Sequence, residues 1–160
     1  MIMGPISLSG KTEDDLVNFP GSRYADPLFS WEDTVGPTDI EFLSSSKLGA
    51  KYTNNIFVGD IKWGNLYFFE VNENRDGIVL DTTQQQSGLS DLVVNGDEEL
   101  SSIIFGSGFG GITDIETGPD GFLYVLSYDT EIEKLPGGFL NITSYNEGAI
   151  YKISPNNTAR

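Results

Sequence analysis

One stretch organises the whole sequence: Gly111-Ile-Thr-Asp-Ile-Glu-Thr-Gly-Pro-Asp-Gly-Phe-Leu-Tyr-Val-Leu-Ser127. Residues 112–117 are rich in β-branched side chains, and residues 122–126 form an apolar run with aromatic and β-branched members, so both are typical of short strands. Between them, Pro119 suits the first central position of a tight turn and Gly121 gives freedom at its end. The stretch therefore predicts two strands joined by a turn.

Part of this stretch occurs twice. The tetrapeptide Thr38-Asp39-Ile40-Glu41 reappears as Thr113-Asp114-Ile115-Glu116. Two strand-like segments follow each copy, and the second segment opens with Gly-x-Leu/Ile-Tyr: they are 55–60 and 64–71 after the first copy, 121–127 and 148–154 after the second. Repeated antiparallel strand units are typical of propeller-like arrays. We therefore expect an all-β fold, a partial β-propeller with about two four-stranded antiparallel blades.

The predicted organisation has three parts. An irregular lead-in covers residues 1–23, the C-terminal blades of a β-propeller cover 24–154, and a polar tail covers 155–160. The first blade is expected over roughly 36–105, with 101–105 as its outer strand, and the second over roughly 111–154, with 129–147 as an inserted loop. Before the first blade, Phe29 and Trp31 alternate in a segment expected to bring aromatic rings onto the core.

Two blades alone leave sheet faces uncovered. Repeat arrays usually need about three units or more for stability. We therefore expect this chain to be the C-terminal part of a larger propeller. Either missing blades or self-association would then cover the open faces.

Composition excludes several classes of function. Nine Lys and Arg against 24 Asp and Glu give a formal net charge of −15, and so acidic a surface repels the phosphates of nucleic acids. The chain has no Cys, which excludes disulfides, and no His, which removes the commonest general base and the Ser-His-Asp hydrolases. No apolar stretch approaches the roughly 20 residues of a membrane-spanning helix.

Four motifs, in order, carry a resemblance to a known family: Asp26-Pro-Leu-Phe-Ser-Trp31, Gly36-Pro-Thr-Asp-Ile-Glu-Phe42, Phe57-Val-Gly-Asp-Ile-Lys62 and Gly118-Pro-Asp-Gly-Phe-Leu-Tyr124. Over residues 24–154 the chain resembles the C-terminal blades of glucose/sorbosone dehydrogenase-like proteins. The resemblance implies a six-bladed propeller whose intact form oxidises an aldose sugar. Many soluble members of that family do so with pyrroloquinoline quinone (PQQ) and calcium.

The resemblance also implies cofactor contacts. In that family a lysine on the equivalent hairpin faces the carboxylates of the quinone, which indicates Lys62, and a hydroxyl group at the place of Thr34 faces the cofactor. A solvated turn lysine and an ordinary turn threonine are the alternatives for these two residues. Quinone-binding members carry Arg where this chain has Gly111 and Thr113, and their catalytic His and calcium ligands lie in earlier blades. The chain alone is therefore expected to be inactive as a dehydrogenase.

Two acidic patterns have competing explanations. The pairs Asp39/Glu41 and Asp114/Glu116 resemble the paired acids of glycoside hydrolysis, but their recurrence at one blade position favours a structural role, bonding backbone amides between strands. Residues 72–77 imitate the start of a calcium loop. Thr83 stands where such a loop needs a bidentate Glu, so a hairpin turn is favoured.

The sequence leaves two functional hypotheses, and it also indicates where the protein is located. Trp31, Trp63 and the tyrosines are candidates for a sugar-stacking surface, although packing in the core is the commoner use of aromatic rings. Glycosylation sequons at Asn141 and Asn156, both in predicted loops, together with the resemblance favour an extracellular or cell-surface protein. The first hypothesis is part of a PQQ-dependent sugar dehydrogenase. The alternative is a non-catalytic extracellular propeller that binds carbohydrate or protein.

Overall fold

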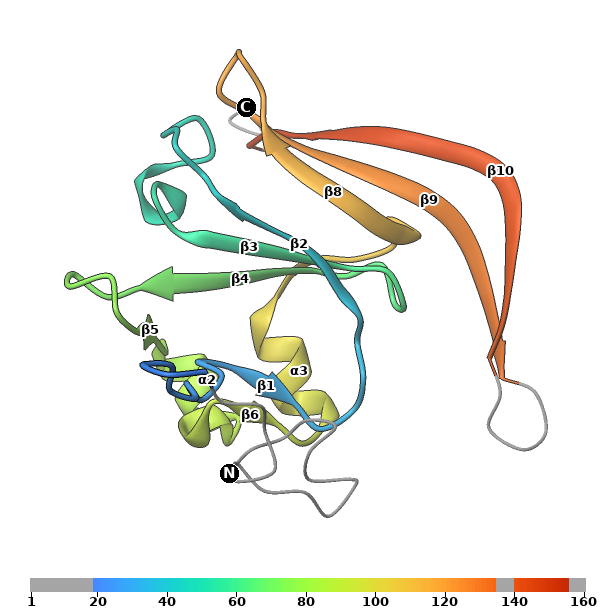
Figure 1. Cartoon of the computed structure of the whole chain (residues 1–160). Helices are drawn as coiled ribbons and strands as arrows, with labels where there is room; N and C mark the ends of the chain where they lie inside the picture. Colours follow the sequence, from blue (N-terminus) through green and yellow to red (C-terminus); the bar gives the residue numbers. More distant parts are fainter. Residues whose placement is uncertain (1–18, 135–139, 156–160) are drawn as a thin grey trace.

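The computed structural model describes residues 19–134 and 140–155 of the chain. Figure 1 shows two antiparallel sheets lying face to face, with the helices on the far side of the first sheet. Most of the regular structure is strand, which confirms the predicted all-β class.

The first sheet has the order β2-β3-β4-β5, and its strands are β2 (Pro37–Phe42), β3 (Ile56–Asp60), β4 (Leu66–Val71) and β5 (Ile78–Val79). The short strand β7 (Ile104–Gly106) also pairs with β4, beside residues 66 and 67, whereas β5 pairs with residues 70 and 71. The short strands β5 and β7 therefore share the outer edge of β4. The predicted outer strand at 101–105 was wrong in part, because residues 97–103 form a helix.

The second sheet has the order β10-β9-β8 and consists of β8 (Gly111–Thr117), β9 (Leu123–Lys134) and β10 (Leu140–Ile153). It has three strands in the part of the chain that the structure describes, where four were expected. The predicted loop at 129–147 was wrong, because β9 and β10 continue through most of it as one long hairpin. Asn141 consequently lies in β10 and not in a loop, and Asn156 lies outside the described residues.

The two sheets repeat one pattern of strand pairing. Asp39 lies opposite Gly59 in the first sheet, and Asp114 lies opposite Leu126 in the second. A register shift precedes each of these pairs, and in both sheets the unpaired residue is the threonine of the repeated tetrapeptide. The third strands agree as well, since Gly59 pairs with Leu66 and Leu126 pairs with Ile150. The predicted internal repeat is confirmed across three strands.

The apolar core between the sheets holds them together. It contains Leu43, Leu48, Phe57 and Leu66 from the first sheet and its loops, and Ile112, Ile115, Leu123 and Val125 from the second. Burial of such side chains stabilises a fold by about 1.5–3 kcal/mol each. Gly59 permits a close approach of the two sheets, because a Cβ atom there would lie 2.4 Å from Cγ2 of Ile112.

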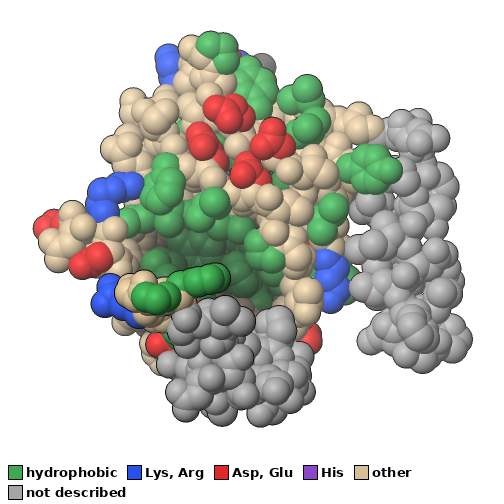
Figure 2. Space-filling view, viewed as in Figure 1, with side chains coloured by type: hydrophobic (Ala, Val, Ile, Leu, Met, Phe, Trp, Pro, Cys, Tyr) green, Lys and Arg blue, Asp and Glu red, His purple; other side chains and the backbone are tan. Residues whose placement is uncertain are grey.

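The acids of the first tetrapeptide join the two sheets. Oδ2 of Asp39 accepts a 2.7 Å hydrogen bond from the backbone N–H of Ile115, and Oε1 of Glu41 accepts from both N–H and Oγ1 of Thr117. Figure 2 shows acidic side chains gathered where β2 and β8 lie side by side. The predicted structural role, bonding backbone amides between strands, is confirmed for this copy.

Alanine at Asp39 is expected to lower the free energy of unfolding by about 1–2 kcal/mol, because a charged acceptor is removed from a partly buried amide. The matched control is Asp114→Ala, at the same position of the second tetrapeptide. The Asp114 side chain is exposed, so we expect a change within about 0.5 kcal/mol. Urea unfolding of both variants measures the difference. Equal losses would contradict the inter-sheet role of Asp39.

A second, smaller core covers the other face of the first sheet. The side chains of Val58, Tyr67 and Phe69 pack there against Leu89, Val94 and Ile103. Aromatic rings from the segment before the first blade join them, with the Phe29 ring 4.6 Å from that of Phe69 and the Trp31 ring 5.4 Å from that of Tyr67. The prediction that this segment brings rings onto the core is confirmed.

Short elements between the strands build this second core. They are β1 (Ser30–Trp31), the 3-10 turn Leu89–Asp91, α2 (Thr82–Gln86), β6 (Val93–Val94) and α3 (Asp97–Ile103), whereas the 3-10 turn Ala50–Tyr52 packs its tyrosine against the first core. A reciprocal capping box begins α2, where Asp81 accepts from the Gln84 amide and the Gln84 side chain accepts from the Asp81 amide. The predicted irregular lead-in lies mostly outside the described residues.

Candidate functional site

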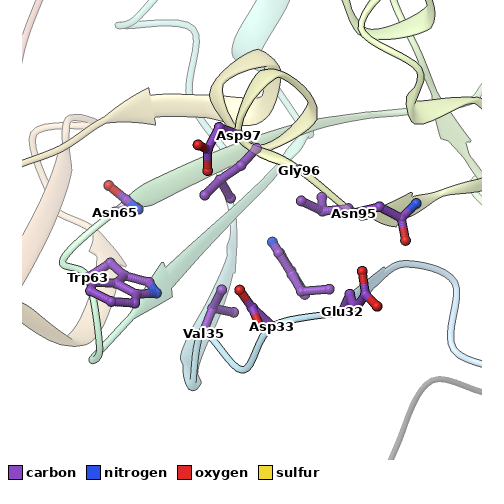
Figure 3. Close-up of a pocket in the computed structure, with 11 residues that line it drawn as sticks. Glu32, Asp33, Val35, Trp63, Asn65, Asn95, Gly96 and Asp97 are labelled. Carbon is purple, nitrogen blue, oxygen red and sulfur yellow. The ribbon is translucent and has the colours of Figure 1, made fainter. Parts of the chain in front are cut away.

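A cavity of about 370 Å³ opens between residues 31–35, the β3–β4 turn and the start of α3. Figure 3 shows Trp63 and Asn65 on one side, Asp97 and Gly96 at the helix, and Glu32, Asp33 and Val35 along the segment after β1. Trp31, Val94, Asn95 and Leu100 complete the lining. Both tryptophans of the chain therefore meet at one cavity.

Parallel pairing of β1 with β6 forms two walls of this cavity. Ser30 lies opposite Val93 and Trp31 opposite Val94, and the amide of Glu32 donates to the carbonyl of Val94 at 2.9 Å. These bonds fix the acidic residues after β1 beside Asn95. The Asn95 side chain itself turns away, since its Nδ2 donates to the carbonyl of Val93 at 3.0 Å.

A buried carboxylate shapes the third wall. Asp60 is fully buried at the end of β3, and its Oδ1 accepts from the amides of Trp63 and Gly64 at 2.5 and 3.2 Å. Its Oδ2 accepts from the Tyr67 hydroxyl at 2.6 Å, with a longer contact to the Asn65 amide. Four donors thus converge on one side chain, which sets the course of the β3–β4 turn and the positions of Trp63 and Asn65.

Burial, and next the hydrogen bond to Asp60, raise the pKa of the Tyr67 hydroxyl well above its ordinary value, against a smaller opposing effect from Asn65. The folded chain then keeps this proton after the unfolded chain has lost it. Stability should therefore fall as the pH rises above about 10, by at most about 1.4 kcal/mol per pH unit. Urea unfolding at several alkaline pH values measures the slope, and Tyr67→Phe should flatten it. Equal slopes in both proteins would contradict the assignment.

The cavity is acidic and aromatic in character. Glu32, Asp33 and Asp97 are exposed carboxylates on its lining, and Trp63 is 55% exposed. Nε1 of Trp31 is buried without a hydrogen-bond partner among the described residues. A buried indole N–H usually has an acceptor, so Trp31 departs from the usual pattern at the edge of this cavity.

The two cofactor contacts suggested by the sequence lie together beside this cavity. The Lys62 Nζ atom donates to the main-chain carbonyl of Thr34 at 2.8 Å, and it lies 4.6 Å from the centre of the Trp63 ring. Thr34 is exposed between Asp33 and Val35. Neither Lys62 nor Thr34 belongs to the cavity lining. The lysine is therefore held in place by the chain itself.

The residues of this cavity do not fit PQQ, which is a tricarboxylate. Three carboxylates line the cavity, and the adjacent cation is engaged by a carbonyl oxygen and an aromatic ring. Gly111 is buried in β8 opposite Tyr128, and Thr113 occupies the register shift of the same strand. Neither residue supplies a charge to bind the cofactor, and each missing charged hydrogen bond is worth roughly 1.5–3 kcal/mol.

The loop at residues 72–77 forms the turn between β4 and β5. Nδ2 of Asn72 donates to Oδ1 of Asp76 at 2.8 Å, and the amide of Asp76 donates back to Oδ1 of Asn72. The favoured interpretation as a hairpin turn is confirmed. Across the described part of the chain, no three acidic side chains cluster closely enough to hold a metal ion.

No family model matches the chain, and no curated protein matches it significantly. Within residues 19–134 and 140–155, no helix has the length and apolar character needed to cross a membrane.

Proposed function

We propose that this chain supplies two adjacent blades of a β-propeller and that the cavity between Trp31 and Trp63 binds a carbohydrate. The propeller interpretation is supported by the repeated strand register and by the matching register shifts at Thr38 and Thr113. Face-to-face stacking of such units is how propellers bury their sheets. The glycosylation sequons and the resemblance support an extracellular location for this binding protein.

The carbohydrate proposal rests on the meeting of both tryptophans at one polar cavity. Sugars present apolar C–H faces, which stack on aromatic rings, and hydroxyl groups, which donate to carboxylates. Trp63 offers an exposed ring, and Asp33 and Asp97 offer acceptors. A neutral ligand also avoids the repulsion that a net charge of −15 imposes on anions.

Tryptophan fluorescence tests this proposal directly, because the only two tryptophans of the sequence both line the cavity. Titration with neutral mono- and oligosaccharides should give a saturable change in emission. We expect Trp63→Ala to weaken binding about two- to tenfold, measured by calorimetry, since one aromatic contact is worth about 0.5–1.5 kcal/mol. Phe42→Ala is the matched control, because Phe42 is another exposed ring (44%) that lies outside the cavity.

The absence of a saturable response to every neutral sugar would overturn the carbohydrate proposal. Equal weakening by Trp63→Ala and Phe42→Ala would place the binding site elsewhere.

A dehydrogenase fragment is the second candidate, and it rests on the resemblance, which indicates Lys62 and Thr34 as cofactor contacts. Titration with PQQ and calcium, followed by the absorbance of the quinone, separates the two candidates. Saturable binding that Lys62→Ala weakens would support the dehydrogenase fragment. Carbohydrate binding without quinone binding would support the non-catalytic protein.

A further inference from the structure

The segment between β6 and α3 contains the only Asn-Gly pair of the sequence, Asn95-Gly96. Both residues are exposed, and both line the cavity that Trp31 and Trp63 share. Figure 3 shows them where the segment enters the helix. An asparagine followed by glycine is especially prone to spontaneous deamidation, because glycine has no Cβ atom to hinder attack by its main-chain nitrogen.

The main-chain nitrogen of Gly96 is free to react. Among the described residues, no group accepts a hydrogen bond from this N–H, whereas the amide of Asn95 donates to Oε2 of Glu99 at 2.5 Å. The backbone of Gly96 is extended, with a φ of −163°, and a Cβ atom there would meet nothing within 4 Å. The Gly96 nitrogen therefore has the room that ring closure onto the Asn95 side chain needs.

One hydrogen bond restrains the side chain of Asn95. Its Nδ2 atom donates to the carbonyl of Val93 at 3.0 Å, and this bond is exposed to water. A neutral, exposed hydrogen bond contributes little net stability, so the side chain leaves it for roughly a tenth of the time. The carbonyl carbon Cγ of Asn95 can then approach the nitrogen of Gly96. The bond to Val93 slows the reaction but does not prevent it.

We propose that Asn95-Gly96 is a site of spontaneous modification, at which the asparagine is converted to aspartate or isoaspartate. The Gly96 nitrogen loses its proton to solvent and forms a bond to Cγ of Asn95, and the bond between Cγ and Nδ2 breaks as ammonia leaves. Water then opens the resulting succinimide ring at either carbonyl. Each conversion consumes one water molecule and releases one ammonia molecule, without oxidation or reduction.

The product changes the rim of the cavity. Each conversion makes the formal net charge more negative by one, from −15 to −16, and adds a carboxylate to those of Glu32, Asp33 and Asp97. A carboxylate cannot donate to the carbonyl of Val93, so the bond that Asn95 makes there is lost. Isoaspartate also lengthens the main chain between β6 and α3. We therefore expect the two cavity walls that this segment joins to shift.

Peptide mass spectrometry of the full chain, incubated in isotopically labelled water at neutral and at mildly alkaline pH, measures the conversion. We expect residue 95 to convert about tenfold or more faster than Asn72, which precedes Glu73 and is bonded to Asp76 through both ends of its amide. The product should carry the label, include isoaspartate, and form faster at the higher pH, because the attacking nitrogen must lose a proton. Aspartate alone would indicate direct hydrolysis and would overturn the ring mechanism.

Gly96→Ala is the decisive variant. Alanine fits the extended backbone and the open space at this position, so the fold should be kept, which circular dichroism checks. Its methyl group hinders ring closure, and conversion at residue 95 should slow about tenfold or more. Gly108→Ala, which also places a methyl group in open space, is the matched control and should leave the rate unchanged.

An unchanged rate in Gly96→Ala would overturn the proposal, and so would a rate at residue 95 no higher than that at Asn72. The measurement needs no ligand. Its result is therefore independent of whether the cavity binds a carbohydrate.

Discussion

Replacing Asp60 by alanine is expected to lower the free energy of unfolding by about 3–5 kcal/mol. The carboxylate is fully buried and accepts from the amides of Trp63 and Gly64 and from the hydroxyl of Tyr67. Alanine leaves these donors buried without an acceptor. Urea unfolding followed by tryptophan fluorescence measures the loss.

The matched control is Asp76→Ala. Asp76 also lies in a hairpin turn of the first sheet and accepts a side-chain hydrogen bond, but it is exposed. Water replaces the lost partner there, so we expect a change within about 0.5–1 kcal/mol. A loss at Asp60 no larger than that at Asp76 would show that the turn does not depend on the buried carboxylate. A carbohydrate site at Trp63 should weaken in parallel with the turn.

The repeat was the part of the fold that the sequence predicted best. Strand pairing has a period of two residues, so a recurring tetrapeptide in two strands predicts that its members face the same way in both sheets. The shared register around Asp39 and Asp114 confirms this prediction. The structural role of the acids could also be predicted, because carboxylates at one recurring position serve packing more often than chemistry.

The short helices and the long hairpin could not be predicted in the same way. Residues 82–86 and 97–103 are mostly polar and too short to show a helical apolar period, so they depend on tertiary packing and, for 82–86, on the Asp81–Gln84 capping box. Residues 129–147 lack the apolar alternation of a covered strand. Pairing of β9 with β10 extends there because a hairpin can lengthen through backbone hydrogen bonds alone.

The candidate site was predicted only in its components. Trp31 and Trp63 were candidates for sugar stacking, but nothing in the sequence indicated that they share one cavity. Their meeting depends on β1 pairing with β6, two strands of two residues each. Asp60 did carry a local signal. An aspartate at the end of a strand, followed by the turn Lys62-Trp63-Gly64, is typical of side chains that bond their own turn amides.

Replacing Gly64 by alanine is expected to lower the free energy of unfolding by about 2–5 kcal/mol, for two additive reasons. The backbone of Gly64 has a φ of +64°, an angle that residues other than glycine rarely adopt. A Cβ atom there would also lie 2.0 Å from the carbonyl oxygen of Gly110, so the loop before β8 would have to move. Thermal unfolding by circular dichroism measures the loss.

Gly108→Ala separates these two reasons. Gly108 has a φ of +83° and lies in the same loop as Gly110, yet a Cβ atom there meets no atom within 4 Å. We expect a loss of about 1–2 kcal/mol from backbone conformation alone. The excess loss at Gly64 then measures the contact between the β3–β4 turn and the strand that begins the second sheet.

Because β8 also carries the amides bound by Asp39 and Glu41, displacement of its start should weaken that inter-sheet contact. Gly64→Ala combined with Asp39→Ala should therefore lose less than the sum of the two single losses. Strict additivity would mean that the turn and the carboxylates hold the two sheets independently.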